Sequence, residues 1–91
     1  MIKLLTSNRE RGGRMDLERK KFLIGLNITY YRRKKHLTQS ELSAQVGISS
    51  NYISQIERGS KCISLEKLFQ VAEALGVEDR DLLDYSRETQ A

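Results

Sequence analysis

The sequence predicts an all-α protein, a compact bundle of five helices within residues 16–85. Apolar residues recur at spacings of three and four along several stretches, as one face of a helix requires. Gly47, Gly59 and Gly76 each follow such a stretch, at the position where glycine commonly ends a helix. Ser, Thr or Asp precedes most of the stretches, where a helix start is expected. A chain of 91 residues can bury a modest but sufficient core as one domain.

The first helix is expected from about Asp16, an N-cap residue, to Lys35. Ile24, Ile28 and Tyr31 follow one another at i, i+4 and i+7 and should face the core. Other residues add apolar surface to this helix: Leu17, Phe22, Leu23, Leu26 and Tyr30.

A short second helix should begin after Thr38. Thr38 and Glu41 have the spacing of a capping box, in which each side chain bonds to the backbone N–H of the other residue. Leu42 and Val46 are four residues apart and share one face. Gly47 then ends the helix in a tight turn.

The third helix begins at Ser49 or Ser50, either of which can serve as its N-cap. Ile53 and Ile56 form its inner face, and Gly59 follows its end. The two short helices and the glycine turn therefore form a pair of about twenty residues.

Short polar side chains occupy the outer face of this third helix: Ser50, Asn51, Ser54 and Gln55. An ordinary solvated face carries Lys, Glu and Arg instead. Asn and Gln can pair bidentately with adenine, and Ser can pair with several bases. This face therefore predicts contacts with base edges in the DNA major groove. The alternative is an ordinary helical hairpin with a polar surface.

The fourth helix should run from about Ser64 to Leu75, with Gly76 as its stop. Its expected buried residues are Leu65, Leu68, Phe69, Ala72 and Leu75. A short fifth helix is expected from about Asp79 to Asp84, and this region carries Leu82, Leu83 and Tyr85.

Charge is distributed unevenly. Residues 1–35 contain eleven Lys or Arg and three acidic residues, whereas residues 62–91 contain three basic and seven acidic residues. The whole chain has a net charge of +4. Such a distribution would orient the molecule toward a polyanion. Candidate phosphate contacts near the third helix are Ser49, Tyr52, Arg58 and Lys61, with Lys34 from the first helix.

Catalysis and metal binding have few candidate residues. Cys62 is the only cysteine, which excludes an internal disulfide and a Cys-based zinc site, and it is expected to be a small apolar filler. His36, the only histidine, falls in the turn after the first helix and should face solvent. We find no convincing carboxylate pair. The sequence therefore predicts no enzyme, no cofactor, no metal and no small-molecule substrate.

No apolar run is long enough for a transmembrane helix, and the first residues lack a secretory signal. We therefore expect a cytoplasmic protein without membrane contact.

Residues 1–15 differ from the rest of the chain, since Arg9 to Arg14 is polar and interrupted by glycine. We expect a flexible arm or translated leader here, and a loose tail at residues 86–91. As an arm it could enter the minor groove. As a leader it would precede a true start at Met15, because Glu-Arg-Gly-Gly can be encoded by a purine-rich ribosome-binding sequence. Unchanged operator affinity after deletion of residues 1–14 would exclude the arm.

From residue 22 to about 84 the chain resembles the Cro/CI-type helix-turn-helix family, the XRE-like transcriptional regulators. The resemblance implies a lambda-repressor-like DNA-binding domain at residues 16–85, with the third helix as recognition helix. It implies that Gln39 bonds a phosphate and braces that helix, and that Arg32 pairs with Glu57. It also assigns base contacts to the four outer-face residues named above.

The resemblance implies a sequence-specific regulator, a repressor that binds a palindromic operator in double-stranded DNA as a homodimer. Candidate dimer contacts are Leu82, Leu83 and Tyr85, although the two leucines could instead belong to the core. Alternatives are a controller protein of a restriction-modification system, an antitoxin, and a protein-interaction module that does not bind DNA.

Overall fold

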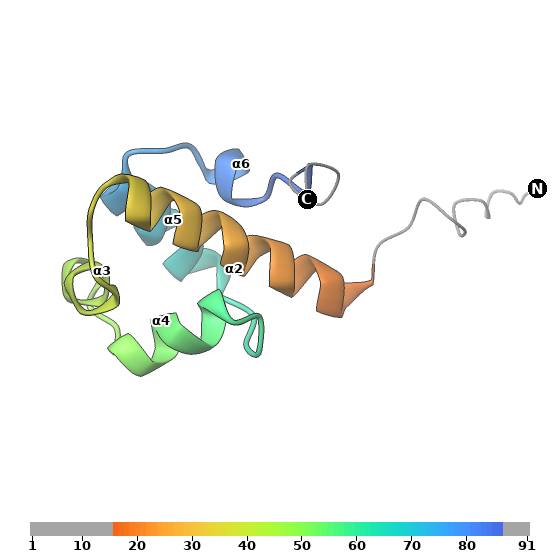
Figure 1. Cartoon of the computed structure of the whole chain (residues 1–91), viewed down its shortest axis with the longest axis horizontal. Coiled ribbons are helices and arrows are strands. Elements are labelled where there is room, and N and C mark those ends of the chain that lie inside the picture. Colours follow the sequence, from red (N-terminus) through yellow and green to blue (C-terminus); the bar gives the residue numbers. More distant parts are fainter. Residues whose placement is uncertain (1–15, 87–91) are drawn as a thin grey trace, which may run out of the picture.

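The computed structural model describes residues 16–86, which form five α-helices and no strand. With the labels of Figure 1, these helices are α2 (Leu17–Lys34), α3 (Gln39–Val46), α4 (Ser50–Glu57), α5 (Leu65–Leu75) and α6 (Asp79–Leu82). The predicted all-α, five-helix fold is confirmed for this part of the chain. The predicted arm at residues 1–15 and residues 87–91 of the predicted tail lie outside the described residues. No helix within residues 16–86 is both long and apolar enough to cross a membrane.

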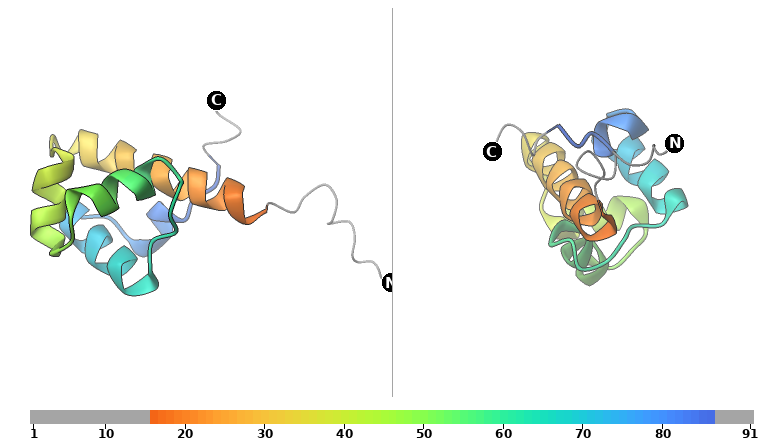
Figure 2. Two further views of the ribbon diagram at one scale, coloured as in Figure 1. Left: turned by 90° about the horizontal axis from the view of Figure 1, so that it is seen from below. Right: turned by 90° about the vertical axis from the view of Figure 1, so that its right-hand side faces the viewer.

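The long helix α2 is the support on which the other elements are assembled. It contacts α4, α5 and α6, while α3 packs between α4 and α5 (Figure 1). Viewed along α2, these neighbours surround one side of the helix and leave the other side open (right panel of Figure 2). The core between them consists of Ile24, Ile28, Leu42, Ile53, Ile56, Ile63, Leu68, Val71, Ala72, Leu75 and Leu82.

Local capping interactions explain why the helices begin where the sequence predicts. The Asp16 carboxylate accepts a hydrogen bond from the Arg19 N–H at 2.9 Å. The capping box of α3 is complete, with Thr38 N–H donating to Glu41 at 2.8 Å and Glu41 N–H to Thr38 at 3.0 Å. Ser64 caps α5. Each cap satisfies a backbone donor that the first helical turn leaves without a partner.

The helix ends agree less closely with the prediction. Helix α2 ends at Lys34, one residue before the predicted Lys35, and α6 ends at Leu82 rather than Asp84. The end of α2 lies just before a turn in which His36 takes a left-handed φ of 61°. His36 is exposed, as expected.

Two residues of α5 that were predicted to be buried face solvent. Leu65 is 64% exposed and Phe69 46% exposed, whereas Val71, which was not predicted, is fully buried. At about 100° per residue, Leu68, Val71 and Leu75 form one narrow face, and Leu65 and Phe69 fall to one side of it. Apolar character and near-helical spacing therefore did not predict the burial of these two residues correctly.

The prediction for Cys62 was also wrong. The side chain is exposed in the loop before α5 and fills no space in the core. Its neighbour Ile63 takes the buried position instead.

The short helix α6 is fastened to α2 by a buried asparagine that the sequence did not reveal. Asn27 is fully buried, and its Nδ2 donates to the carbonyl of Leu82 at 3.0 Å and to that of Asp84 at 2.7 Å. These carbonyls lie where α6 ends and need partners from outside the helix. Asn27 thus holds the C-terminal segment across α2.

Candidate nucleic-acid interface

The turn between α3 and α4 sets the angle at which α4 leaves the domain. Gly47 adopts φ 80° and ψ 32°, a left-handed conformation that glycine accepts without strain. The N–H groups of Gly47 and Ile48 both donate to the Ser43 carbonyl, at 2.8 and 3.0 Å. Ser49 then caps α4 by accepting from Tyr52 N–H at 3.0 Å. Of the two predicted caps, Ser49 is therefore the one used, and Ser50 becomes the first residue of the helix.

Helix α4 has one apolar and one polar face. Ile53 and Ile56 are buried in the core. On the other side, Ser50 and Asn51 are exposed, and the side chains of Ser54 and Gln55 are partly exposed. The structure therefore brings the four predicted base-reading residues to one accessible face.

A glycine in the middle of α2 lets α4 approach closely. A Cβ atom on Gly25 would lie 2.4 Å from the Ile56 carbonyl oxygen and 2.7 Å from that of Glu57. Only a residue without a side chain fits at this crossing. The role of Gly25 was not predicted, although an isolated glycine inside an apolar helical pattern is a signal for close packing.

A buried ion pair fixes the end of α4. Arg32 Nε donates to Glu57 Oε2 at 2.7 Å and Arg32 Nη2 to Oε1 at 3.0 Å, with side chains only 9% and 6% exposed. Gln39 Nε2 donates to the same Oε1 at 3.0 Å, and Arg32 Nη1 to the Leu37 carbonyl at 2.7 Å. The predicted pair is thus present, and Gln39 braces α4 as the resemblance implied.

The charge state of Glu57 depends on these contacts. Burial by itself would raise the pKa of the Glu57 carboxyl. Hydrogen bonds from Arg32, Gln39 and Thr29, together with the charge of Arg32, outweigh burial and lower this pKa below its ordinary value of 4.5. Glu57 is therefore ionised at neutral pH and holds Arg32 and Gln39 in place.

Two cationic residues lie close to the outer face of α4. Arg58 Nη1 donates to Ser54 Oγ at 2.6 Å, so a candidate phosphate contact and a candidate base contact touch each other. Lys61 Nζ lies 5.7 Å from the centre of the Tyr52 ring. The Tyr52 hydroxyl accepts from Ser64 N–H at 3.4 Å, which connects α4 to the start of α5.

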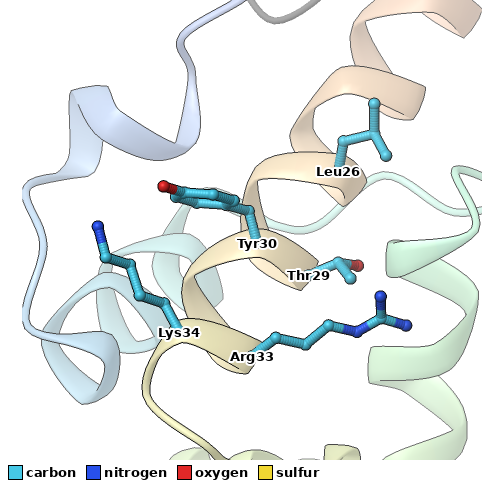
Figure 3. Close-up of a pocket in the computed structure, with 5 residues that line it drawn as sticks. All are labelled: Leu26, Thr29, Tyr30, Arg33 and Lys34. Atoms are coloured by element: carbon cyan, nitrogen blue, oxygen red, sulfur yellow. The ribbon is translucent and has the colours of Figure 1, made fainter. Parts of the chain in front are cut away.

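Lys34 does not lie beside α4. Its Nζ is 5.4 Å from the centre of the Tyr30 ring, and the residue borders a hollow with Leu75 and Val77. Arg33 and Lys34 leave α2 in different directions, with Arg33 on the side of α4 (Figure 3). Lys34 therefore lies apart from the candidate phosphate residues around α4, because one residue turns a helix by about 100°, and its contact with a phosphate stays a prediction.

The three predicted dimer residues have different environments. Leu82 is fully buried in the core and cannot touch another molecule, so this part of the prediction was wrong. Leu83 is 39% exposed, and Tyr85 is half-buried against the core. Adjacent leucines on a short helix necessarily point in different directions, which explains why only one of them is in the core.

Comparisons with known proteins agree with this geometry. Residues 28–82 match the family model described as helix-turn-helix, HTH_3. The chain is 40% identical over 67 residues to y4dJ of Sinorhizobium fredii, named as an HTH-type transcriptional regulator; this match covers 74% of the chain and 87% of y4dJ.

Two solved structures also resemble the structure of this chain. One is the restriction-modification controller protein C.AhdI from Aeromonas hydrophila, with a TM-score of 0.71 and 29% identity, covering 75% of this chain and 99% of that one. The other is SinR, a master regulator for biofilm formation, in complex with DNA. For SinR the TM-score is 0.65 and the identity 37%, with coverage of 67% of this chain and 98% of that one.

Proposed function

This chain belongs to the XRE-like helix-turn-helix family of transcriptional regulators, and we propose that it represses transcription as a dimer on a palindromic operator. The observation that carries the proposal is the outer face of α4, where small polar side chains are accessible on a helix held firmly at both ends. Gly25 and the Arg32–Glu57 pair fix its C-terminal end, and the Gly47 turn fixes its start.

Base reading is assigned to the outer face of α4. Asn51 is exposed near the N-terminus of the helix, where recognition helices approach base edges, and its amide suits the N6 and N7 groups of adenine. Ser54 lies about one turn further on. Ser50 and Gln55 flank these two residues and complete the surface.

Phosphate contacts are assigned to residues around the rim of this face. Gln39 is the first residue of α3, where the helix dipole favours an anion, and its side chain is already oriented by Glu57. The Ser49 hydroxyl accepts a backbone hydrogen bond and still has a proton to donate. Arg58 and Lys61 supply positive charge, and the Tyr52 ring supports Lys61.

Dimerisation is assigned to the C-terminal side of the domain. A single domain reads only about half an operator, so two copies separated by roughly one helical turn of DNA are needed for specificity. Leu83 is exposed and Tyr85 partly so, and both follow the part of α6 that Asn27 fastens to α2. Helix α5, which packs against α6, exposes two more apolar side chains, Leu65 and Phe69.

Selection of bound duplexes from a random DNA library tests the proposal. We expect a consensus with twofold symmetry and half-sites about one helical turn apart. Repeating the selection with Asn51→Ala and Ser54→Ala should relax the preference at separate positions in each half-site. A library that yields no preferred sequence, or the same sequence with both variants, would contradict the assignment.

A second candidate is a controller protein of a restriction-modification system. It is favoured by the similarity to C.AhdI over almost the whole of that chain. In this case the chain should bind the promoter of its own gene, and genes for a methyltransferase and a nuclease should lie beside it. Absence of both neighbouring genes would leave the general repressor as the better proposal.

A further inference from the structure

The side of α2 that faces away from the core carries a second apolar stripe. Phe22, Leu26 and Tyr30 follow one another at i, i+4 and i+8 and are 42%, 37% and 42% exposed. The solvent side of a helix in a small domain is normally polar, so folding alone does not account for this stripe. A groove on this side is lined by Leu26, Thr29, Tyr30, Arg33 and Lys34 (Figure 3). We call this surface the outer face of α2.

Positive charge lies near both ends of the stripe. Arg33 and Lys34 extend from α2 on different sides of the groove (Figure 3). At the other end, the Arg19 guanidinium lies 5.7 Å from the centre of the Phe22 ring. Within residues 16–86, none of the residues that line the groove is acidic. A complementary ligand must therefore combine an apolar surface with negative charges at its edges.

We propose that the outer face of α2 docks an amphipathic helix with acidic flanks from a partner protein. Apolar residues one turn apart, such as Phe22, Leu26 and Tyr30, match the spacing at which a bound helix presents its own side chains. Acidic residues beside the apolar face of that helix would meet Arg33 and Lys34. The inference does not depend on the operator or on the dimer proposed above.

Charge disfavours a second copy of α2 as the occupant, because cations would then face cations. Nucleic acid is a weaker candidate as well, since phosphates gain nothing from the exposed side chains of Phe22 and Leu26. A protein helix satisfies both the apolar and the charged parts of the surface.

The groove on α2 shares no lining residue with the four residues of α4 to which base reading is assigned. Helix α4 meets α2 at its C-terminal end, where the Ile56 and Glu57 carbonyls approach Gly25, whereas Asn51 lies in the first turn of α4. Leu26 follows Gly25 directly, is 37% exposed and lines the groove on α2 (Figure 3). A partner on the outer face of α2 could therefore bind the protein while DNA occupies α4.

Two synthetic helical peptides of about five turns test the proposal on the full chain. Both carry Leu at i, i+4, i+7 and i+11; one has Glu at the flanking positions and the other has Lys. Binding is measured by fluorescence anisotropy and located by amide chemical shifts. We expect the Glu peptide to bind at α2 about tenfold more tightly than the Lys peptide, and Arg33→Glu to reverse this preference.

Leu26→Ser should weaken binding of the Glu peptide about tenfold. Leu17→Ser is the matched control. Leu17 is 62% exposed on the same helix, but its side chain lies about 180° around the helix axis from the groove residues. Thermal unfolding of each variant monitors folding. The proposal is overturned if neither peptide binds, if both bind equally, if Leu17→Ser has the same effect, or if the shifts lie outside α2. It is also overturned if Leu26→Ser disrupts self-association or DNA binding instead, since the surface would then serve a second copy or nucleic acid.

Discussion

Glu57 is the residue on which the position of the recognition helix depends most. Its carboxylate is nearly inaccessible and accepts hydrogen bonds from α2 and α3 at the same time. A buried ion pair contributes little net stability compared with an apolar pair, but loss of one partner leaves an uncompensated buried charge. The pair therefore specifies the position of α4 more than it stabilises the fold.

Glu57→Gln should lower the free energy of unfolding at neutral pH by about 3 to 5 kcal/mol, because Arg32 keeps a buried charge without its partner. The double variant Arg32→Met with Glu57→Leu should lose less than Glu57→Gln. Urea denaturation followed by circular dichroism measures both. Equal and small losses in the two variants would show that the pair is not energetically coupled.

The stability of the protein should depend on pH through the same residue. The pKa of Glu57 is lower in the folded chain than its ordinary value of 4.5, so the unfolded chain binds this proton more readily. The stabilisation is fully present above pH 4.5 and is lost as the pH falls through the lowered pKa of the folded state. Below pH 4.5 the wild-type protein should lose stability more steeply than Glu57→Gln. Parallel pH profiles of the two proteins would contradict this.

Asn51 and Lys61 should affect DNA binding in different ways. Asn51→Ala should cost about 1 to 3 kcal/mol on the selected operator and relax one base position, because it removes a base contact. Lys61→Ala should weaken binding to all sequences similarly and reduce the salt dependence by about one logarithmic unit. Titrations at several salt concentrations, on operator and on random duplex, separate these effects. A uniform loss for Asn51→Ala would assign it to the DNA backbone.

At the scale of helices, two contacts of α2 determine where its neighbours lie. Gly25 permits the close approach of α4, and Asn27 binds the carbonyls at the end of α6. The two residues are separated by only one position, yet they serve opposite sides of the same helix. Helix α2 thus positions both the recognition helix and the proposed dimer segment.

Gly25→Ala should destabilise the fold even though alanine is the better helix former by about 1 kcal/mol. The added Cβ would meet two backbone carbonyl oxygens, and backbone atoms cannot rotate away. We expect a net loss of about 1 to 3 kcal/mol and weaker operator binding, because α4 must shift. Gly25→Ser should be worse still. A melting temperature equal to or above that of the wild type would show that α2 and α4 can move apart without loss of stability.

Asn27→Leu should release α6 from α2. The substitution keeps a similar volume but leaves the carbonyls of Leu82 and Asp84 without their donor, at a cost of about 1 to 3 kcal/mol. Amide hydrogen exchange should accelerate in α6 while exchange in α3 and α4 changes less. Uniform acceleration across all helices would indicate global destabilisation instead of local release.

At the scale of the whole molecule, positive and negative charge are separated. Arg58 donates to Ser54 on the outer face of α4 and Lys61 lies over the Tyr52 ring, whereas the N-cap and first turn of α6 carry Glu78, Asp79 and Asp81. A polyanion is attracted to one region and repelled from the other. This separation leaves the C-terminal side of the domain available for a second copy.

Leu83→Ser and Tyr85→Ala should shift the protein from dimer to monomer at tens of micromolar, as sedimentation equilibrium can measure. Loss of dimerisation should weaken operator binding and leave binding to a single half-site unchanged. Leu17→Ser, an exposed leucine at the start of α2, is the control. A wild-type protein that is monomeric and binds the full operator equally well would exclude this dimer.

Much of the fold follows from local sequence signals. The capping box at Thr38 and Glu41 and the stop at Gly47 were predictable because capping and turn formation involve neighbours within a few residues. The apolar spacing of Ile53 and Ile56 likewise fixed which face of α4 is buried, and therefore which face is accessible. Local chemistry thus determined the helices and which face of α4 is accessible.

Contacts between distant parts of the chain were decided only by the tertiary structure. Leu65 and Phe69 have near-helical spacing but lie outside the core, because none of the helices α2 to α6 covers their side chains. Lys34 lies away from α4, and Leu82 is buried while Leu83 is exposed, because packing angles between helices determine which side of each helix is covered. The closeness of Gly25 to Ile56 and the bonds of Asn27 to Leu82 depend on residues 31 and 55 positions apart. No local pattern encodes such pairs, since they exist only after the helices have packed.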